Sequence, residues 1–319
     1  MCESYEPDVR WDMHGITDRH GFEQLIIVKG YFHDQVPVEF VDAFKTVEYL
    51  QAHFYYWWPM YDEAMNKALR ILEMSVKLKA KELNIPLEFT TDKNKTFKKT
   101  IYALINEIFM EPYLVNLKEQ IHRARKIRNS QMHPETNSFK GGIGGLGKNM
   151  ELFVLVINEL FRENEWLQDH FNQDVQFAKQ IELFRNNLLV FEKNGQGILS
   201  SGIIAFRLLD ETLLLILNPV LTNTIQALSE HRYPNPIKVE LSTFAFQDEM
   251  LCGTSVEGHQ TRIFTTAKPE NLRLFENHQS GLEAVNELDR CFYNHFMADE
   301  ASWSLVKMEY NYLKKQLDL

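Results

Sequence analysis

Cysteine is scarce in this chain of 319 residues, and the three present, Cys2, Cys252 and Cys291, have no paired spacing. The chain therefore predicts neither a disulfide framework nor a zinc ribbon, and a reducing cytoplasm is the expected location. No stretch approaches the roughly 18 apolar residues that cross a bilayer, so no membrane association is expected. The N-terminus lacks a basic segment followed by an apolar run, which argues against a secretory leader.

Several chemical signatures are also missing. The 11 histidines show no metal-ligand spacing with Cys, Asp or Glu, so we expect no metal and no cofactor. No G-x-S-x-G elbow is present. "GIGGLGKN" (142–149) matches the first part of a phosphate-binding loop, but Asn149 replaces the Ser or Thr that would contact magnesium, and no hydrophobic strand precedes it. We interpret residues 135–149 as a glycine-rich loop without a nucleotide site.

Positive charge is in deficit overall but concentrated in one segment. The formal net charge is −10, yet residues 76–133 hold 12 Lys and Arg against 6 Asp and Glu. A basic segment within an acidic protein is what a localised phosphate contact requires, although a solvated helix face has the same composition. The segment is therefore a candidate anion-binding surface.

The pattern of apolar residues divides the chain into three parts. Residues 1–36 form an N-terminal extension with one short predicted strand at 23–32. Residues 37–192 show helical periodicity almost throughout, which predicts a mainly α helical bundle. After a boundary near 192–197, alternating strand and helix patterns predict a smaller α/β domain of unknown role over 193–319.

One helix of the predicted bundle ends in "RARKIRNSQMHPE" (123–135). Leu114, Leu117, Ile121 and Ala124 form an apolar stripe, and the next position in the same rhythm is Arg128. A charged side chain is almost never buried without a partner. The stripe must therefore become a groove, an interface or an anion site at that turn, although basic residues at a helix end are also common without any function.

Two further polar residues follow Arg128. Asn129 and His133 are four residues apart and share a helix face, and Pro134 ends the helix directly after His133. The helix C-terminus favours a protonated histidine, while the surrounding cations oppose it, so the two effects on the pKa of His133 partly cancel. The local pattern is compatible with an acid–base role and with a simple helix-capping role.

"RNSQMH" (128–133) resembles the R-x4-H signature of the HEPN superfamily. The helix order is also similar to that family over about 45–190, with earlier helices at 68–83 and 97–109 and a strongly apolar helix after the motif. The acidic residue often found on the earlier helix would correspond to Glu73. The resemblance implies a helical domain that acts in RNA processing, phage defence or as a toxin.

The resemblance further implies a metal-independent endoribonuclease in which the 2′-hydroxyl of RNA attacks the adjacent phosphorus. Such a reaction needs a base, an acid and a cation near the phosphate. We expect His133 to be the general acid–base, Arg128 to stabilise the phosphate charge and Asn129 to orient the histidine or a phosphate oxygen. The flanking cations expected to bind RNA are Arg123, Arg125 and Lys126.

One chain supplies one motif histidine, so a homodimer through the helix that carries Arg128 and His133 is expected to complete the site. The C-terminal domain would then receive a regulatory protein or a small-molecule trigger. Two alternatives remain open. The domain could bind RNA or a nucleotide without catalysis, or it could serve only for dimerisation, with Arg128 paired to a carboxylate.

Overall fold

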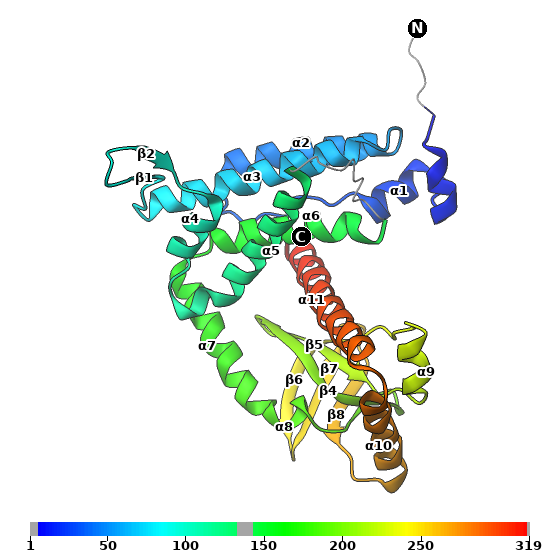
Figure 1. Ribbon diagram of the computed structural model, residues 1–319. Helices are drawn as coiled ribbons and strands as arrows, with labels where there is room; N and C mark the ends of the chain where they lie inside the picture. Colours follow the sequence, from blue (N-terminus) through cyan, green and yellow to red (C-terminus); the bar gives the residue numbers. More distant parts are fainter. Residues whose placement is uncertain (1–5, 133–142, 318–319) are drawn as a thin grey trace. The chain divides into compact units, whose positions relative to one another are not determined.

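A computed structural model describes residues 6–132 and 143–317, without the side chains of residues 128–146. The chain divides into two compact units. The first contains residues 1–168 and 310–319, and the second contains residues 169–309. Figure 1 shows the helices and strands of each unit.

The first unit is helical apart from one small hairpin, which confirms the prediction of a helical N-terminal region. Its elements are a 3-10 helix at Val9–His14, α1 (Arg19–Ile26), α2 (Val38–Phe54), α3 (Met60–Glu82), β1 (Glu88–Thr90), β2 (Thr96–Lys98), α4 (Ile101–Ile108), a 3-10 turn at Pro112–Leu114, α5 (Val115–Met132) and α6 (Ile143–Leu160). Two further helices, α7 (Asn164–Gln180) and α11 (Glu287–Leu317), cross the boundary between the units.

Helix α6 forms the centre of the first unit. Residues 150–157 are all buried, as the apolar sequence "MELFVLVINELF" leads one to expect of a central helix. It packs against α3 and α5, while α2 packs along α3. The helix begins at Ile143, so the predicted glycine-rich loop over 135–149 is wrong for its second half. Favourable packing of the apolar residues that follow offsets the low helix propensity of glycine.

The strand predicted at 23–32 is absent, because α1 occupies Arg19–Ile26. The carboxylate of Asp18 caps this helix by accepting a hydrogen bond from the backbone N–H of Gly21 at 2.7 Å. Beyond the helix, the Gln51 side chain accepts from the backbone N–H of Val28 at 3.0 Å and donates to its carbonyl at 3.1 Å. The Gln51 side chain thus takes both backbone hydrogen bonds of Val28, which a neighbouring β-strand would otherwise make.

The second unit contains an antiparallel barrel and not the predicted α/β domain. Its strands β3–β8 pair in chain order, and β3 also pairs with β8, which closes the barrel. The elements are α8 (Glu182–Arg185), β3 (Leu189–Lys193), β4 (Gln196–Leu209), β5 (Thr212–Pro219), α9 (Thr224–Ser229), β6 (Ile237–Gln247), β7 (Met250–Ser255), β8 (Gln260–Thr265) and α10 (Pro269–Ala284).

Tight turns explain the antiparallel topology. Asn194, Gly195, Asp210 and Asp248 adopt positive φ angles between consecutive strands, and such short connections can join only antiparallel neighbours. The predicted domain boundary at 192–197 lies in the first of these turns, between β3 and β4, whereas the compact units divide after residue 168. The sequence change that we took for a domain boundary is a hairpin inside the barrel.

Strand β5 is buried on both faces, which accounts for its uninterrupted apolar sequence. Leu213, Leu215 and Leu217 point into the barrel core, while Leu214 and Ile216 pack in a second cluster with Ala301 and Met308 of α11. Strand β4 is irregular near Gly202, whose φ is +133°. A Cβ added there would lie 2.0 Å from the carbonyl oxygen of Arg185, so only glycine fits.

A buried charge cluster lies at the edge of this unit. The Arg207 guanidinium is 3.2 Å from a carboxylate oxygen of Asp174 and 3.7 Å from one of Glu309. The three side chains are only 16%, 13% and 7% exposed. Burial raises the pKa of Asp174 even though Arg207 lowers it. Arg207 therefore neutralises two carboxylates that would be costly to bury alone.

Candidate functional site

Helix α5 carries most of the candidate site residues proposed from the sequence. It follows a short 3-10 turn, and its predicted apolar stripe is buried: Leu114 and Leu117 are 7% and 6% exposed, and Ile121 and Ala124 are 1% and 0% exposed. The stripe faces the core of the first unit, where α5 packs on α6. The helical period that we used to place Arg128 therefore holds over the described part of the helix.

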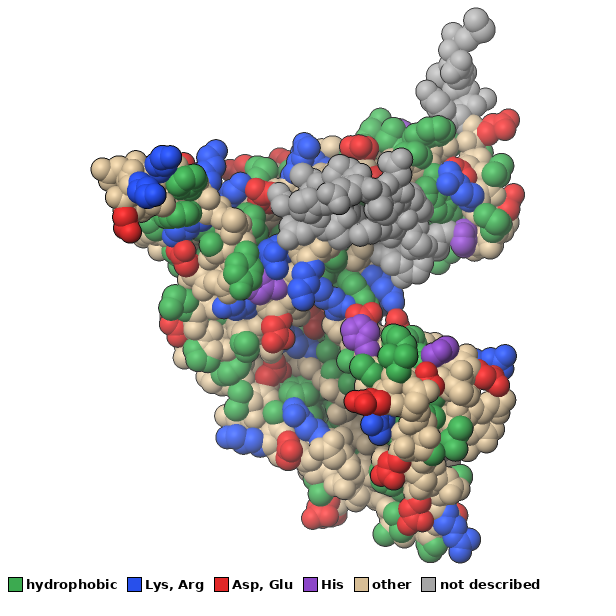
Figure 2. Space-filling view, in the orientation of Figure 1, with side chains coloured by type: hydrophobic (Ala, Val, Ile, Leu, Met, Phe, Trp, Pro, Cys, Tyr) green, Lys and Arg blue, Asp and Glu red, His purple; other side chains and the backbone are tan. Residues whose placement is uncertain are grey.

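The structure describes only part of the predicted site. Residues 128 and 129 belong to α5, but their side chains lie outside the described part of the molecule. His133 lies outside the described residues altogether. The described site residues are Arg123 and Arg125, which are partly buried, and Lys126, which is exposed. Figure 2 shows Lys and Arg side chains gathered over α5 and over the β1–β2 hairpin.

Arg125 is held against an aromatic ring. Its guanidinium carbon lies 5.0 Å from the centroid of the Tyr102 ring on α4, which is a cation–π contact. Its Nε is buried and finds no hydrogen-bond partner among the described residues. A buried donor without an acceptor is costly unless a ligand or water supplies one. An anion bound here would supply the acceptor that the buried Nε of Arg125 lacks among the described residues.

His122 lies beside Arg125 on the same helix. Its ring centroid is 5.2 Å from that of Tyr102, and its Nδ1 is buried without a partner among the described residues. Burial lowers the pKa of His122, and the positive charges of Arg125, Lys118 and Lys126 lower it further. The imidazole is consequently neutral near pH 7 and can accept a proton or a hydrogen bond.

A cavity of about 610 Å³ adjoins these residues. Its lining comes from α3, the hairpin and its flanks, α4 and α5. The charged residues that line it are Glu73, Lys77, Glu88, Lys98, Lys99 and Arg125. The volume falls within the range of sites that hold small ligands. Four cations against two carboxylates give the cavity a positive balance, which favours an anionic occupant.

Ion pairs neutralise part of this charge. Lys77 lies 2.6 Å from Glu73, and Lys99 lies 2.5 Å from Glu107. Lys98 and Arg125 form no ion pair within the described parts of the chain. Glu73, which the resemblance would place at an acidic family position, lines the same cavity as Arg125.

Sequence inspection missed His122 and Tyr102 as members of this site. Lys118, His122 and Arg125 are spaced by four and three residues, so the signal that places them on one helix face was present in the sequence. Tyr102 carried no such signal, because its position depends on how α4 crosses α5. Its ring brings the histidine and the arginine together by contacting both.

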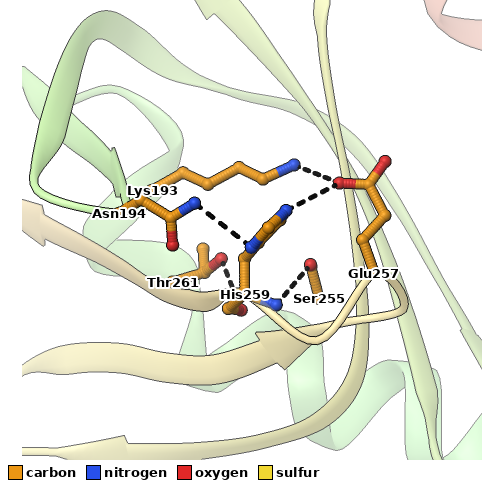
Figure 3. Close-up of polar contacts among 6 residues, drawn as sticks. All are labelled: Lys193, Asn194, Ser255, Glu257, His259 and Thr261. Carbon is orange, nitrogen blue, oxygen red and sulfur yellow. Dashed lines mark hydrogen bonds and ion pairs between the residues drawn. The ribbon is translucent and has the colours of Figure 1, made fainter.

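A second polar cluster lies in the barrel unit, where the β3–β4 and β7–β8 turns meet (Figure 3). Glu257 lies 2.5 Å from Lys193 and 3.6 Å from Nε2 of His259. Asn194 contacts Nδ1 of His259 at 3.1 Å. Ser255 Oγ accepts a hydrogen bond from the backbone N–H of His259 at 3.2 Å, not from its ring. Ser255 therefore makes no contact with the imidazole ring that could activate it as a nucleophile. The contacts of the cluster instead link the β3–β4 turn to the β7–β8 turn.

Two other kinds of feature are absent from the described part of the chain. Among the side chains of residues 6–127 and 147–317, no group of three or more His, Cys, Asp and Glu could hold a metal ion. Within residues 6–132 and 143–317, no helix has both the length and the apolar character required to cross a membrane. Comparison with protein-family models, curated proteins and solved structures gave no match for this chain.

Proposed function

We propose that this protein binds RNA through the surface of α5 and cleaves it without a metal, as a HEPN-type endoribonuclease. The observation that carries the proposal is Arg125, whose guanidinium is fixed over Tyr102 beside a positively balanced cavity and has a buried, unpartnered Nε. Phosphate oxygens are the acceptors that such a guanidinium binds best. In the sequence, the R-x4-H motif begins three residues after Arg125, at Arg128.

The proposed reaction uses the nucleophile that RNA already carries. The 2′-oxygen forms a bond to phosphorus while the bond from phosphorus to the 5′-oxygen breaks, which leaves a 2′,3′-cyclic phosphate and a 5′-hydroxyl. A base takes the 2′-hydroxyl proton and an acid gives a proton to the leaving 5′-oxygen. We assign these transfers to His133 of two subunits, charge stabilisation to Arg128 and orientation to Asn129.

The second copy of His133 requires a homodimer through α5. Isologous dimers are the commonest soluble oligomers, and the shared helix would bring two motifs into one cleft. Light scattering of the purified protein tests this part of the proposal. A monomer at concentrations where RNA is cleaved would exclude the two-subunit assignment.

Cleavage in EDTA tests the reaction itself. Labelled RNA is incubated with the wild-type protein and with His133→Ala and Arg128→Ala, beside the matched controls His14→Ala and Arg70→Ala, which alter exposed residues elsewhere in the first unit. Loss of a general acid–base lowers rates by about 100-fold or more. Cleavage that persists in EDTA, survives both controls and disappears in both motif variants supports the proposal. Equal rates in wild type and His133→Ala would refute it.

The neutral imidazole of His122 supplies a further arm of the same experiment. If His122→Gln abolishes cleavage and His133→Ala does not, the proton transfers belong to His122 and the motif assignment is wrong. If both variants are inactive, His133 keeps its role and His122 positions the substrate or Arg125. Circular dichroism of each variant separates these results from unfolding.

A binding function without cleavage is the second candidate, and the size of the cavity favours it. A volume of about 610 Å³ with mixed charges suits a single nucleotide. This candidate predicts binding that depends on Arg125 and Lys98, with no RNA product under any condition.

The expected trigger of the C-terminal unit would be sought at a second cavity, of about 730 Å³, which lies between α9 and α10 and has no charged residue in its lining.

A further inference from the structure

The β1–β2 hairpin carries two phenylalanine rings directly opposite each other. Phe89 pairs with Phe97 in the strand register, their ring centroids are 5.9 Å apart, and the planes are inclined by 30°. The rings are 48% and 49% exposed. Contact between them stabilises the hairpin, as cross-strand aromatic pairs do, but leaves about half of each ring in water. A ring surface is thus available for stacking.

The hairpin buries little else. All six residues of its strands are exposed, and its backbone is closed by a hydrogen bond from Thr91 N–H to the carbonyl of Lys95 at 3.0 Å. Figure 1 shows the hairpin extending beyond the helices of the first unit. Short two-stranded hairpins are marginally stable in water, so the ring pair supports the hairpin while about half of each ring stays exposed.

Positive charge surrounds the ring pair. The hairpin and its flanks carry Lys93, Lys95, Lys98 and Lys99 against Glu88 and Asp92. Alternation along β2 places Lys98 on the face opposite to Phe97, and Lys95 directly precedes the strand. Lys98 and Lys99 also line the cavity that contains Arg125. Lys98 therefore directly follows a residue of the ring pair and also lines the cavity.

We propose that this hairpin binds single-stranded RNA, with a base stacked on the Phe89–Phe97 pair and neighbouring phosphates held by Lys95 and Lys98. The inference rests on the proposed function and deepens it by naming the substrate class. Single-strand binders combine aromatic rings with a cationic track, because unpaired bases expose their faces. In a duplex those faces are covered by neighbouring bases. The hairpin would lead the strand into the cavity beside α5.

Fluorescence anisotropy with a fully 2′-O-methyl RNA of about 12 nucleotides tests the inference without cleavage, because this probe lacks the 2′-hydroxyl. The same sequence is measured as a single strand and as a duplex. The test variant is the double substitution Phe89→Leu and Phe97→Leu, which keeps apolar volume and removes the ring faces. The matched control is Phe292→Leu, which alters a ring that is 50% exposed in the second unit.

The expected result is a loss of single-strand affinity of about tenfold in the double variant, given the measured range for base stacking, with duplex affinity changed less than about twofold. The dependence on salt should remain as in the wild type because no charge is lost. In Lys95→Gln with Lys98→Gln, the slope of log affinity against log salt should fall by about 1.4, the value for two phosphate contacts on a single strand.

Several outcomes would overturn the inference. They include unchanged single-strand affinity in the double variant, an equal loss for single strand and duplex, or an equal loss in Phe292→Leu. If the double variant unfolds by circular dichroism, the lysine variant decides, and an unchanged salt slope there refutes the hairpin as an RNA contact. Cleavage by the wild type in EDTA would still support the proposed function in each of these cases. A wild type that binds neither probe and cleaves nothing would refute both.

Discussion

The substitution Arg125→Met tests whether the guanidinium of Arg125 serves to bind a ligand or to stabilise the fold. Its contact with Tyr102 contributes about 0.5–1 kcal/mol at a partly exposed site. Its buried Nε without an acceptor costs about 1–3 kcal/mol. Methionine keeps most of the apolar stem and adds no buried donor. The free energy of unfolding of Arg125→Met should therefore be unchanged or up to about 2 kcal/mol larger than that of the wild type.

The affinity of Arg125→Met for single-stranded RNA should fall, although its stability does not. Loss of one charge-assisted phosphate contact removes about 1.5–3 kcal/mol, which lowers the affinity for single-stranded RNA at least about tenfold. The slope of log affinity against log salt should decrease by about 0.7. Urea unfolding measures the first quantity, and anisotropy at several salt concentrations measures the second. Arg70→Met, on the exposed side of α3, is the matched control for both.

The combination of results decides between the two roles. A variant that is as stable as the wild type and binds RNA weakly supports a ligand site. A variant that loses more than about 2 kcal/mol of stability and binds RNA normally would show that the guanidinium is structural, and the site built around it would have to be abandoned.

Three further predictions concern stability. Burial is the main cause that lowers the pKa values of His33, His122 and His278 in the folded protein. The unfolded chain therefore binds protons that the folded chain does not, and the urea midpoint of unfolding should fall as the pH drops below about 6.5. A urea midpoint that stayed constant from about pH 7.5 to 5.5 would contradict this. Gly202→Ala should cost about 3 kcal/mol or more, measured by urea unfolding, because its Cβ would meet a backbone carbonyl; wild-type stability would contradict the described strand irregularity. Arg207→Ala should cost about 3 kcal/mol by leaving its two buried carboxylate partners unpaired, and most of the loss should be recovered when both are replaced by amides.

Local periodicity made the helical unit predictable. The stripe from Leu114 to Ala124 and the apolar sequence of α6 each fix which residues are buried, because a helix repeats every 3.6 residues whatever surrounds it. The barrel depends instead on the pairing of β3 with β8, about 70 residues apart in the chain. Strand patterns reveal the strands but not which strand pairs with which, so an α/β domain and an antiparallel barrel looked alike in sequence.

Part of the candidate site could likewise be predicted from the sequence, and part of it could not. Lys118, His122 and Arg125 could have been grouped from their spacing alone. The contribution of Tyr102 and of the hairpin lysines could not, because these residues reach the cavity through the crossing of α4 and α5 and through the fold-back of β1 on β2. Only a three-dimensional structure brings together residues that lie on different elements.

The proposed roles of these groups predict that binding and cleavage can be separated. We assign the hairpin and Arg125 to flanking phosphates, and contacts with flanking phosphates act equally on the bound substrate and on the transition state. Hairpin variants should therefore raise KM and leave kcat nearly unchanged. Arg128→Ala and His133→Ala remove groups assigned to the transition state and should lower kcat.

Steady-state kinetics on one single-stranded RNA tests this separation. The lysine double variant of the hairpin should raise KM by about tenfold or more, because two phosphate contacts are lost, and keep kcat within about twofold. Lysine substitutions that lowered kcat and left KM unchanged would place the hairpin at the reacting phosphate. The cleaved bond would then lie at the hairpin, and α5 would supply the binding contacts instead.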